Sequence, residues 1–184
     1  MSFIKNIVGD DFFLFVGVLR YYKGLTYLLD AIKNLPVKVV ICGQGPYEKK
    51  LKQKANSLGL SNVHFVGVVN EEEKASLYKL CQAVVFPSIL RSEAFGVTLV
   101  EGLMYGKPLI STEINTGTSY VNLNGKTGFV VEPKSSLALR DALLKISSDS
   151  SLRKEMERAS RLRYEELFGN KVMAQSYYNI YKTL

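Results

Sequence analysis

Two glutamates and a glycine mark the segment of this sequence whose residue types best fit a catalytic or ligand-binding site. Glu93 and Glu101 flank Gly96, between an apolar run and a stretch of helical periodicity. A glycine at a helix start lets a ligand approach the backbone, and the first N–H groups of the helix can bind an anion such as a diphosphate. Further along the helix, the Glu101 carboxylate can accept hydrogen bonds from a ribose diol, as acidic residues do in dinucleotide folds.

The two glutamates also have other interpretations. Glu93 can simply cap the helix and interact with its dipole. The pair can instead be the acid and base of a glycoside hydrolase, whose carboxylates lie about 5–9.5 Å apart. The eight helical residues from Glu93 to Glu101 rise about 12 Å. That separation favours two contacts along an elongated ligand.

A second candidate segment, residues 17–24, joins an apolar run to a helical one and carries two cations. Arg20 and Lys23 come just before Gly24, where a helix is expected to begin. A cation beside the positive end of a helix dipole is unfavourable unless an anion lies between them. We therefore expect Lys23, with Arg20, to bind a phosphate group, the alternative being a solvated loop.

The third candidate, Gly43-Gln44-Gly45, indicates a tight strand-to-helix turn. It lacks the GxGxxG spacing and does not follow the first strand, which disfavours a Rossmann dehydrogenase. The sequence also has no P-loop, no GxSxG, no HExxH and no DxD pair that could hold a divalent ion on a diphosphate. We expect no metal cofactor, so phosphate charge must be neutralised by Arg, Lys and helix N-termini.

An alternation of apolar strands and amphipathic helices predicts the fold. Six strand-like runs each lead into a helix or a turn, and the last third of the chain is helical. This pattern predicts an α/β fold, a Rossmann-like parallel six-stranded sheet with helices on both faces and a helical C-terminus, in one domain over residues 1–184. Ligands bind beyond the carboxyl ends of such strands. The expected strands are Phe12–Leu19, Val37–Cys42, Val63–Val66, Ala83–Phe86, Pro108–Ser111 and Gly128–Val131, and the expected helices of the sheet cover about residues 25–32, 46–58, 70–82 and 95–105.

The last helices are divided by Gly169-Asn170. Their apolar positions recur at helical spacing, so each apolar set shares one face of its helix. Asn70 with Glu73 is expected to form a capping box at the start of the third helix of the sheet. The apolar sets of the last three helices are Leu139, Ala142, Leu143 and Ile146, then Leu152, Met156 and Ala159, then Met173, Tyr177, Ile180 and Leu184.

The composition is that of an ordinary globular protein. Of 184 residues, 47% are hydrophobic and 22% are charged. No apolar run approaches the roughly 20 residues that span a bilayer, and the first residues lack a signal-peptide pattern. We therefore expect a cytoplasmic protein. Cys42 and Cys81 are expected to be buried reduced thiols, and His64, the only histidine, a structural residue.

The net charge is +7, from 24 Lys and Arg against 17 Asp and Glu. A basic surface suits anionic partners, which include nucleic acid, an acidic membrane and a phosphorylated small molecule. No nucleic-acid recognition motif accompanies the charge, so we expect no nucleic-acid partner.

A set of short motifs follows in order along nearly the whole chain. The motifs are Phe15-Val16-Gly17 and Lys23-Gly24, Ile41-Cys42-Gly43-Gln44-Gly45-Pro46, Val63-His64-Phe65-Val66-Gly67, Pro87-Ser88, Ser92-Glu93-Ala94-Phe95-Gly96 with Glu101, Gly106-Lys107-Pro108 and Thr127-Gly128-Phe129. Taken in this order, they resemble the retaining group 1 glycosyltransferases, family 4, of the GT-B fold, and Glu93 and Glu101 are spaced like that family's E-x7-E signature.

The resemblance implies a role for each site residue. It implies that Lys23 binds the donor diphosphate, Glu93 lies at the transferred sugar, Glu101 binds the ribose, and the backbone around Gly96 holds the distal phosphate. The catalytic residues would then be Glu93 and Lys23. The donor-binding residues would be Gly17, Arg20, Lys23, Gly43, Gly45, Val66, Val68, Glu93, Ala94, Phe95, Gly96, Val97 and Glu101, of which those near Gly43–Pro46 and Val66–Val68 line the nucleobase pocket.

The chain departs from the family in two ways. The family usually has a basic residue after the glycine that matches Gly17, and here it is Val18. Arg20 would point to the same face if the strand extended that far, and could take over this contact. A full GT-B enzyme also has an N-terminal domain with the acceptor pocket, so we interpret this chain as the C-terminal donor domain, inactive alone.

The implied reaction moves a sugar from a nucleoside diphosphate to an acceptor hydroxyl with retention at the anomeric carbon. UDP-sugars are favoured over GDP-sugars by their frequency in the family. The acceptor would be a glycan or a lipid-linked glycan, with possible peripheral contact at the inner membrane face. One alternative is a non-catalytic module that binds a nucleotide sugar. A less favoured alternative is a basic nucleic-acid-binding domain.

Overall fold

One sheet of six parallel strands forms the centre of the computed structural model, which describes residues 8–182. Within these residues the strand order is β3-β2-β1-β4-β5-β6, and each neighbouring pair is parallel. The α/β Rossmann-like prediction is therefore confirmed. The strands are β1 (Phe12–Val16), β2 (Lys38–Cys42), β3 (Val63–Gly67), β4 (Cys81–Phe86), β5 (Leu109–Thr112) and β6 (Gly128–Val131).

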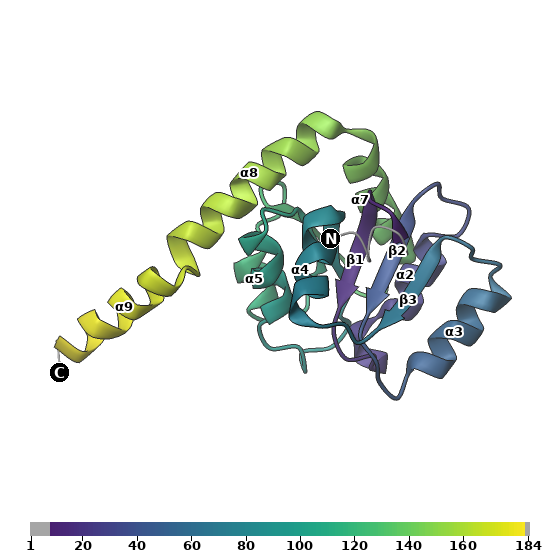
Figure 1. Ribbon diagram of the computed structural model, residues 1–184, viewed down its shortest axis with the longest axis horizontal. Coiled ribbons are helices and arrows are strands. Elements are labelled where there is room, and N and C mark those ends of the chain that lie inside the picture. The colour runs from purple at the N-terminus through teal and green to yellow at the C-terminus, as the bar shows by residue number, and fades with distance from the viewer. Residues whose placement is uncertain (1–7, 183–184) are drawn as a thin grey trace.

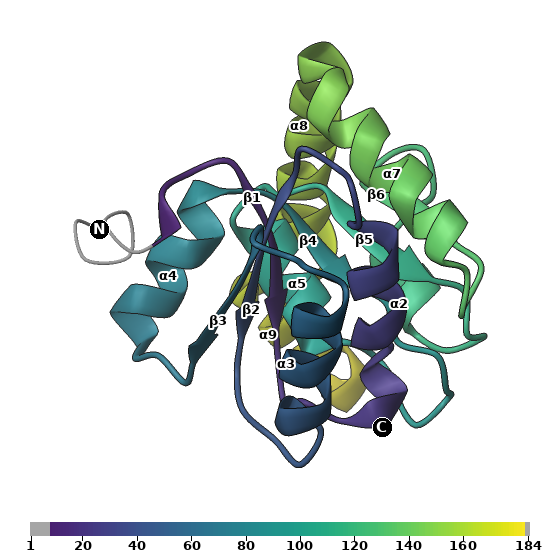
Figure 2. The same ribbon diagram turned by 90° about the vertical axis from the view of Figure 1, so that its right-hand side faces the viewer.

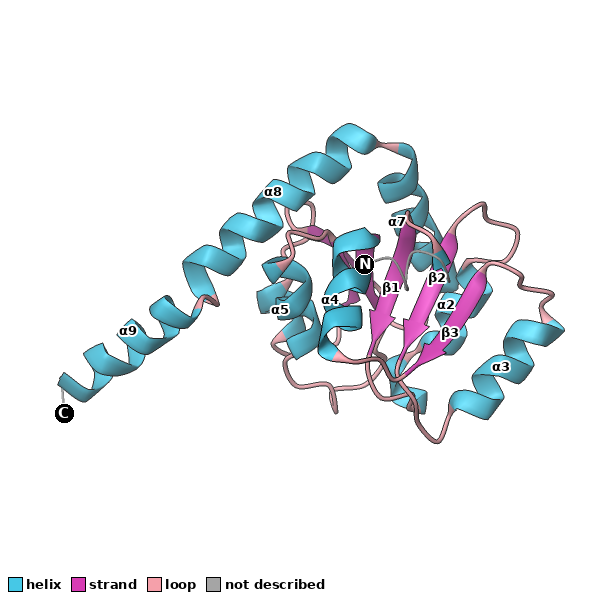
Figure 3. Cartoon of the chain, in the orientation of Figure 1, coloured by secondary structure: helices cyan, strands magenta, loops and turns pink. Residues whose placement is uncertain are grey.

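Helices cover both faces of the sheet. Figure 2 shows α4 on one side of the strands and α2, α3 and α7 on the other, while Figure 3 shows the strands enclosed between helices. The elements of the first face are α2 (Leu25–Ala31), α3 (Glu48–Ser57) and α7 (Ser136–Ser148); those of the second are α4 (Glu71–Leu80), α5 (Val97–Met104) and α6 (Thr118–Val121); η1 (Tyr21–Lys23) follows β1.

Strands β1 to β5 supply side chains to two separate hydrophobic cores. In β1, Phe13 and Phe15 belong to the core beneath α2, α3 and α7, whereas Phe12 and Leu14 belong to the core beneath α4 and α5. All four are fully buried. Successive side chains of a strand point to opposite faces, so a strand covered on both sides reads as an unbroken apolar run.

The strand predicted over Phe12–Leu19 is shorter than expected. β1 ends at Val16, and Gly17 then turns the backbone with φ 150°. Leu19 is nevertheless fully buried, because the chain after β1 stays against the loop that follows β2, with Leu19 N–H donating to the Gln44 carbonyl at 3.0 Å. The apolar run is therefore longer than the strand because Leu19, after the end of the strand, is also buried.

Most other boundaries differ from the prediction by one or two residues. The helix expected from Pro46 begins at Glu48, because Pro46 and Tyr47 form a turn. The helix expected up to position 82 ends at Leu80, since Cys81 is already extended and opens β4. The predicted capping box is confirmed: the Asn70 side chain accepts from the Glu73 N–H at 2.9 Å, and Glu73 accepts from the Asn70 N–H at 3.0 Å.

The C-terminal helices are α8 (Ser150–Leu167) and α9 (Asn170–Lys182), and they separate at the predicted Gly169-Asn170 break. The predicted face of α7 is buried, as is Met156 of α8. The face predicted for α9 is exposed, because the helix projects away from the rest of the domain (Figure 1). Leu184, assigned to that face, lies outside the described residues. Met173, Tyr177, Tyr178, Ile180 and Tyr181 are all exposed.

The cysteine prediction is confirmed, because Cys42 and Cys81 are both buried free thiols. Over residues 8–182, no helix is long and apolar enough to cross a membrane.

Candidate functional site

The order of the strands brings Lys23 and Glu93 together. β1 and β4 are neighbours at the centre of the sheet, and the helices that follow them, α2 and α5, lie on opposite faces. Such a switch point opens a crevice beyond the carboxyl ends of the two strands. The loops there are joined by a hydrogen bond from the Ile89 N–H to the Tyr22 carbonyl at 2.8 Å.

Lys23 and Glu93 form an ion pair in this crevice, between Lys23 Nζ and Glu93 Oε2. Their side chains are 11% and 14% exposed, and Lys23 Nζ also lies 4.8 Å from the centre of the Phe86 ring. Ser88 Oγ donates to the same carboxylate oxygen at 3.4 Å. The sequence assigned the two charges to different parts of a ligand, whereas here they contact each other. A bound phosphate would share Lys23 with Glu93.

Gly96 starts helix α5 in a left-handed conformation, with φ 80° and ψ 65°. A Cβ at this position would lie 3.1 Å from a Leu99 methyl carbon and 3.2 Å from the Phe86 ring, so both backbone and space favour glycine. Thr98 Oγ1 donates to the Val16 carbonyl at 3.2 Å and ties the helix start to the end of β1. The first N–H groups of α5, which have no partner within the helix, thus lie at the crevice.

The residues around Gly96 differ in exposure. Ala94, Phe95 and Val97 are exposed, with Val97 68% accessible, while Gly96 is buried. The Phe95 ring meets Phe168, just beyond α8, edge to face with the ring centres 6.2 Å apart. The helix expected from residue 95 begins only at Val97, so Glu93 precedes it and the helical rise cannot give the separation of Glu93 and Glu101.

Glu101 is held by two residues of helix α4. Tyr78 Oη donates to Glu101 Oε2 at 2.6 Å, and Lys74 Nζ donates to Oε1 at 3.2 Å. Tyr78 is fully buried and stacks on Tyr105, with the ring centres 5.1 Å apart. Burial, reinforced by the bond to Glu101, raises the pKa of Tyr78, so its hydroxyl stays a donor. Neither partner was predicted, although their four-residue spacing on a capped helix places them on one face.

A pocket of about 330 Å³ lies at the carboxyl ends of β1, β2 and β3. Gly17, Gly43 and Val68, all predicted donor-binding residues, line it, and so does Lys74. Val66 does not; it packs against the core beneath α4 and α5. The remaining wall is largely apolar and consists of Val16, Val18, Cys42, Gln44 and Val69.

Gly43 and Gly45 allow two loops to lie very close together. A Cβ on Gly43, whose φ is 132°, would lie 2.0 Å from the Gly17 carbonyl oxygen, and one on Gly45 would lie 2.5 Å from that of Leu19. These glycines let the loop after β2 lie directly against the loop after β1, and Gly43 also lines the pocket.

Arg20 occupies a different place from the one expected. β1 ends at Val16, so the alternation of side chains along a strand does not reach Arg20. The Arg20 side chain is exposed and lines a separate pocket of about 490 Å³ with Tyr21, Pro46, Tyr47 and Lys50. Val18 is 52% exposed and instead lines the 330 Å³ pocket, which Lys74 also lines.

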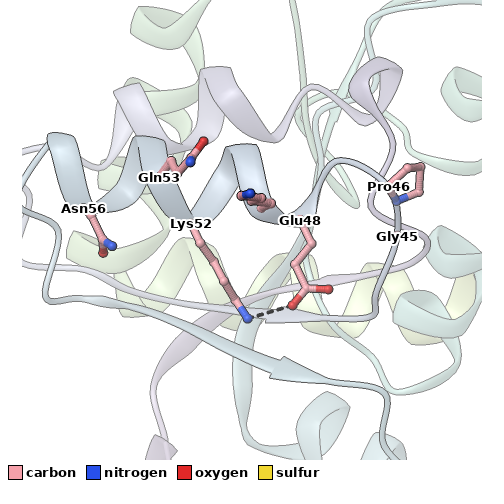
Figure 4. A pocket seen from close by; sticks show the side chains of 7 residues that line it. Gly45, Pro46, Glu48, Lys52, Gln53 and Asn56 are labelled. Atoms are coloured by element: carbon pink, nitrogen blue, oxygen red, sulfur yellow. Dashed lines mark ion pairs between the residues drawn. The ribbon is translucent and has the colours of Figure 1, made fainter.

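Another hollow, of about 510 Å³, runs along helix α3 (Figure 4). It shares only Gly45 with the predicted site residues, and its Glu48 and Lys52 pair with each other at 2.7 Å. Across residues 8–182 there is no group of three or more His, Cys, Asp or Glu side chains that could hold a metal ion.

The sequence of motifs on this scaffold matches one family. The model of that family, described as glycosyl transferases group 1, matches residues 2–163. The chain belongs to the group 1 glycosyltransferases. Its α/β sheet with a helical C-terminus is the half of a GT-B fold that the sequence predicted.

Two curated relatives resemble the chain closely. The D-rhamnosyltransferase WbpZ of Pseudomonas aeruginosa is 52% identical over 164 residues, which are 89% of this chain and 43% of the relative. The O-antigen chain mannosyltransferase C of Escherichia coli is 48% identical over 180 residues, which are 98% of this chain and 48% of the relative. The chain thus spans less than half the length of each.

The fold is also shared with a solved structure, that of Anabaena Alr3699/HepE in complex with UDP. The TM-score is 0.89 at 23% identity, over 100% of this chain and 53% of that one. At this identity the likeness concerns the fold of the group 1 domain.

Proposed function

We propose that this chain is the donor-binding part of a retaining group 1 glycosyltransferase of family 4, which holds a nucleoside diphosphate sugar for transfer to an acceptor hydroxyl. The observation that carries the proposal is the meeting of Lys23 and Glu93 at the strand switch point, beside the start of α5. The names of the two curated relatives, a rhamnosyltransferase and a mannosyltransferase, support it.

The donor would lie along α5. Its diphosphate would meet Lys23 and the N–H groups of the first turn of α5, near Gly96, where helix geometry favours an anion. Its ribose would meet the Glu101 carboxylate, which Tyr78 and Lys74 hold in place. Its base would enter the 330 Å³ pocket lined by Gly17, Gly43 and Val68.

The proposed reaction breaks the bond between the anomeric carbon and the diphosphate, and negative charge develops on the departing phosphate. Lys23 and the α5 N-terminus would stabilise that charge without a metal ion, because fixed charges and dipoles act strongly where water is scarce. Glu93, on the other side of the Lys23 ammonium, would lie at the transferred sugar. The acceptor hydroxyl oxygen would form the new bond to the anomeric carbon with its configuration retained, and the hydroxyl proton would pass to the departing diphosphate.

The proposal extends to partners outside this chain. The exposed apolar side chains of α9 fit a helix that packs on the remaining half of a longer protein, since the chain spans 43% and 48% of its curated relatives. That half would hold the acceptor, a glycan or lipid-linked glycan of polysaccharide synthesis. The net charge of +7 fits work at the acidic inner face of the cytoplasmic membrane.

Calorimetric titration of UDP, GDP and their sugar conjugates, without added metal, tests the proposal. We expect at least one nucleotide to bind with a Kd between micromolar and millimolar. Lys23→Ala and Glu101→Ala should each weaken binding by about 10-fold or more, since each removes a charged hydrogen-bonding group. Lys33→Ala, which removes an exposed lysine, is the matched control and should leave the Kd unchanged.

Two outcomes would contradict the donor-binding proposal. One is the absence of binding for every nucleotide tested. The other is a Kd that stays the same in Lys23→Ala, Glu101→Ala and the control Lys33→Ala. The nucleotide would then bind elsewhere on the domain.

A further inference from the structure

Lys74 lies between two carboxylates and lines the pocket proposed for the base. Its Nζ is 3.2 Å from Glu101 Oε1 and 3.0 Å from Glu71 Oε2. Glu101 is the proposed ribose ligand, whereas Glu71 belongs to the first turn of α4 and its side chain is 87% exposed. A nucleoside that reaches from Glu101 into the pocket would therefore bring the edge of its base to Lys74 and Glu71.

The start of α4 places these two residues next to each other. The capping box of Asn70 and Glu73 fixes the first turn, on which Glu71 is the first residue. A carboxylate is favoured there by the helix dipole, and the Lys74 ammonium three residues later pairs with Glu71 at 3.0 Å. Two of the three Lys74 N–H donors face Glu101 and Glu71, which leaves one donor for a base beside the two carboxylate oxygens of Glu71.

The chemistry of the bases distinguishes how well each fits this pair. Guanine carries a carbonyl oxygen beside two adjacent N–H donors, its ring N1–H and its amino group. A carboxylate can accept both donors at once, while lysine is a common donor to the guanine carbonyl oxygen. Uracil has a single N–H between two carbonyl oxygens, so the second carboxylate oxygen would face an acceptor. Adenine and cytosine likewise offer no two adjacent donors.

We propose that Glu71 and Lys74 read the base of the sugar donor and select guanine, so that the chain prefers GDP-sugars to UDP-sugars. Glu71 accepts from the N1–H and amino groups, and Lys74 donates to the guanine carbonyl oxygen. The apolar walls formed by Val18, Val68 and Val69 enclose the faces of the ring. This inference rests on the proposed donor-binding function and reverses the preference for UDP expected from family frequency.

Inosine diphosphate is the probe that isolates the contact, because it is GDP without the amino group. Calorimetry would compare GDP, IDP and UDP on the wild-type chain and on Glu71→Ala. We expect GDP to bind about 10-fold more tightly than IDP and UDP. Glu71→Ala should weaken GDP to the level of IDP and leave IDP less affected. Glu72→Ala, an exposed carboxylate on the same turn, is the control and should preserve the preference.

The ratio of the GDP and IDP dissociation constants tests whether Glu71 contacts the guanine amino group. A ratio near one in the wild type, a ratio that Glu71→Ala leaves unchanged, or tighter binding of UDP than of GDP would each overturn the base-reading inference while nucleotide binding itself stood. Failure of all three nucleotides to bind would instead overturn the donor-binding function and this inference with it. A thermal unfolding curve for each variant verifies that it is folded.

Discussion

Lys23 donates to Glu93 across the seam between strands β1 and β4, and the two side chains keep only 11% and 14% of their surface exposed. Seventy positions of sequence separate them. A charge with so little contact with water is costly unless it is paired, so each residue depends on the other in the absence of a ligand.

Removing one member of this pair should cost more than removing both. Lys23→Met is expected to lower the free energy of unfolding by about 3 kcal/mol, because it leaves the Glu93 carboxylate without its counter-ion. The double variant Lys23→Met/Glu93→Gln should recover part of that loss. Urea denaturation of the wild type, both single variants and the double variant measures the coupling; strictly additive losses would contradict it.

Gly96 should matter for both stability and ligand binding. Gly96→Ala forces a side chain into a left-handed conformation, at a cost of about 1–2 kcal/mol, and crowds Leu99 and Phe86. Gly59→Ala is the matched control, since Gly59 has φ 66° but open space around it. Both variants should lose stability in urea denaturation, and only Gly96→Ala should weaken nucleotide binding. Equal nucleotide affinities in the two variants would exclude Gly96 from the phosphate site.

Tyr78 should act on the ligand through Glu101. Tyr78→Phe removes the 2.6 Å bond to the carboxylate and keeps the stacked ring. Nucleotide affinity is expected to fall by about 3- to 10-fold, and the discrimination between a ribonucleotide and its 2′,3′-dideoxy analogue should shrink. Tyr105→Phe, the other ring of the stack, serves as control in the same calorimetric titrations. An unchanged discrimination would mean that Glu101 does not depend on Tyr78.

His64 should titrate below its ordinary range. Burial lowers its pKa from 6.5, and the nearby charge of Lys38 lowers it further. Stability contributed by the neutral imidazole is therefore present above pH 6.5 and is lost as pH falls, because the unfolded chain binds the proton first. As the only histidine, His64 gives a single ring signal in NMR. Lys38→Met should raise its midpoint slightly, while Lys33→Met should leave it in place.

The two thiols should make the fold sensitive to alkali. Burial raises the pKa of Cys42 from 9.0 to about 11 and that of Cys81 to about 12. At neutral pH both thiols are protonated in either state. As pH rises through 9 the unfolded chain loses protons first, so the free energy of unfolding then falls by about 1 kcal/mol per pH unit for each thiol. Urea denaturation between pH 9 and 11 should show a smaller fall in Cys42→Ala/Cys81→Ala. Equal slopes would refute this origin.

Local patterns predicted most of the fold. The apolar run from Phe12 identified a strand covered on both faces, and Asn70 with Glu73 identified the start of α4. These features depend on neighbours in the sequence, which set backbone conformation and burial directly. The end of β1 was wrong because Leu19 is apolar for a tertiary reason, its packing beneath the loop after β2.

The contacts within the candidate site could not be predicted in the same way. Lys23 meets Glu93 only because β4 inserts beside β1, and Glu101 meets Lys74 and Tyr78 only because α4 and α5 cover the same face of the sheet. Strand order and the face taken by each helix are properties of the whole chain, and the spacing of single residues does not encode them. Motif spacing therefore identified candidate site residues but not the side chains that contact them.

The outward side of α9 has a consequence for handling the protein. Met173, Tyr177 and Tyr181 are between 49% and 74% exposed on a helix that extends beyond the domain (Figure 1). Exposed apolar surface of this kind promotes association between copies. Preparations of these 184 residues alone should therefore form larger species as their concentration rises, and colloidal behaviour, rather than unfolding, would set the upper limit for crystallisation and NMR.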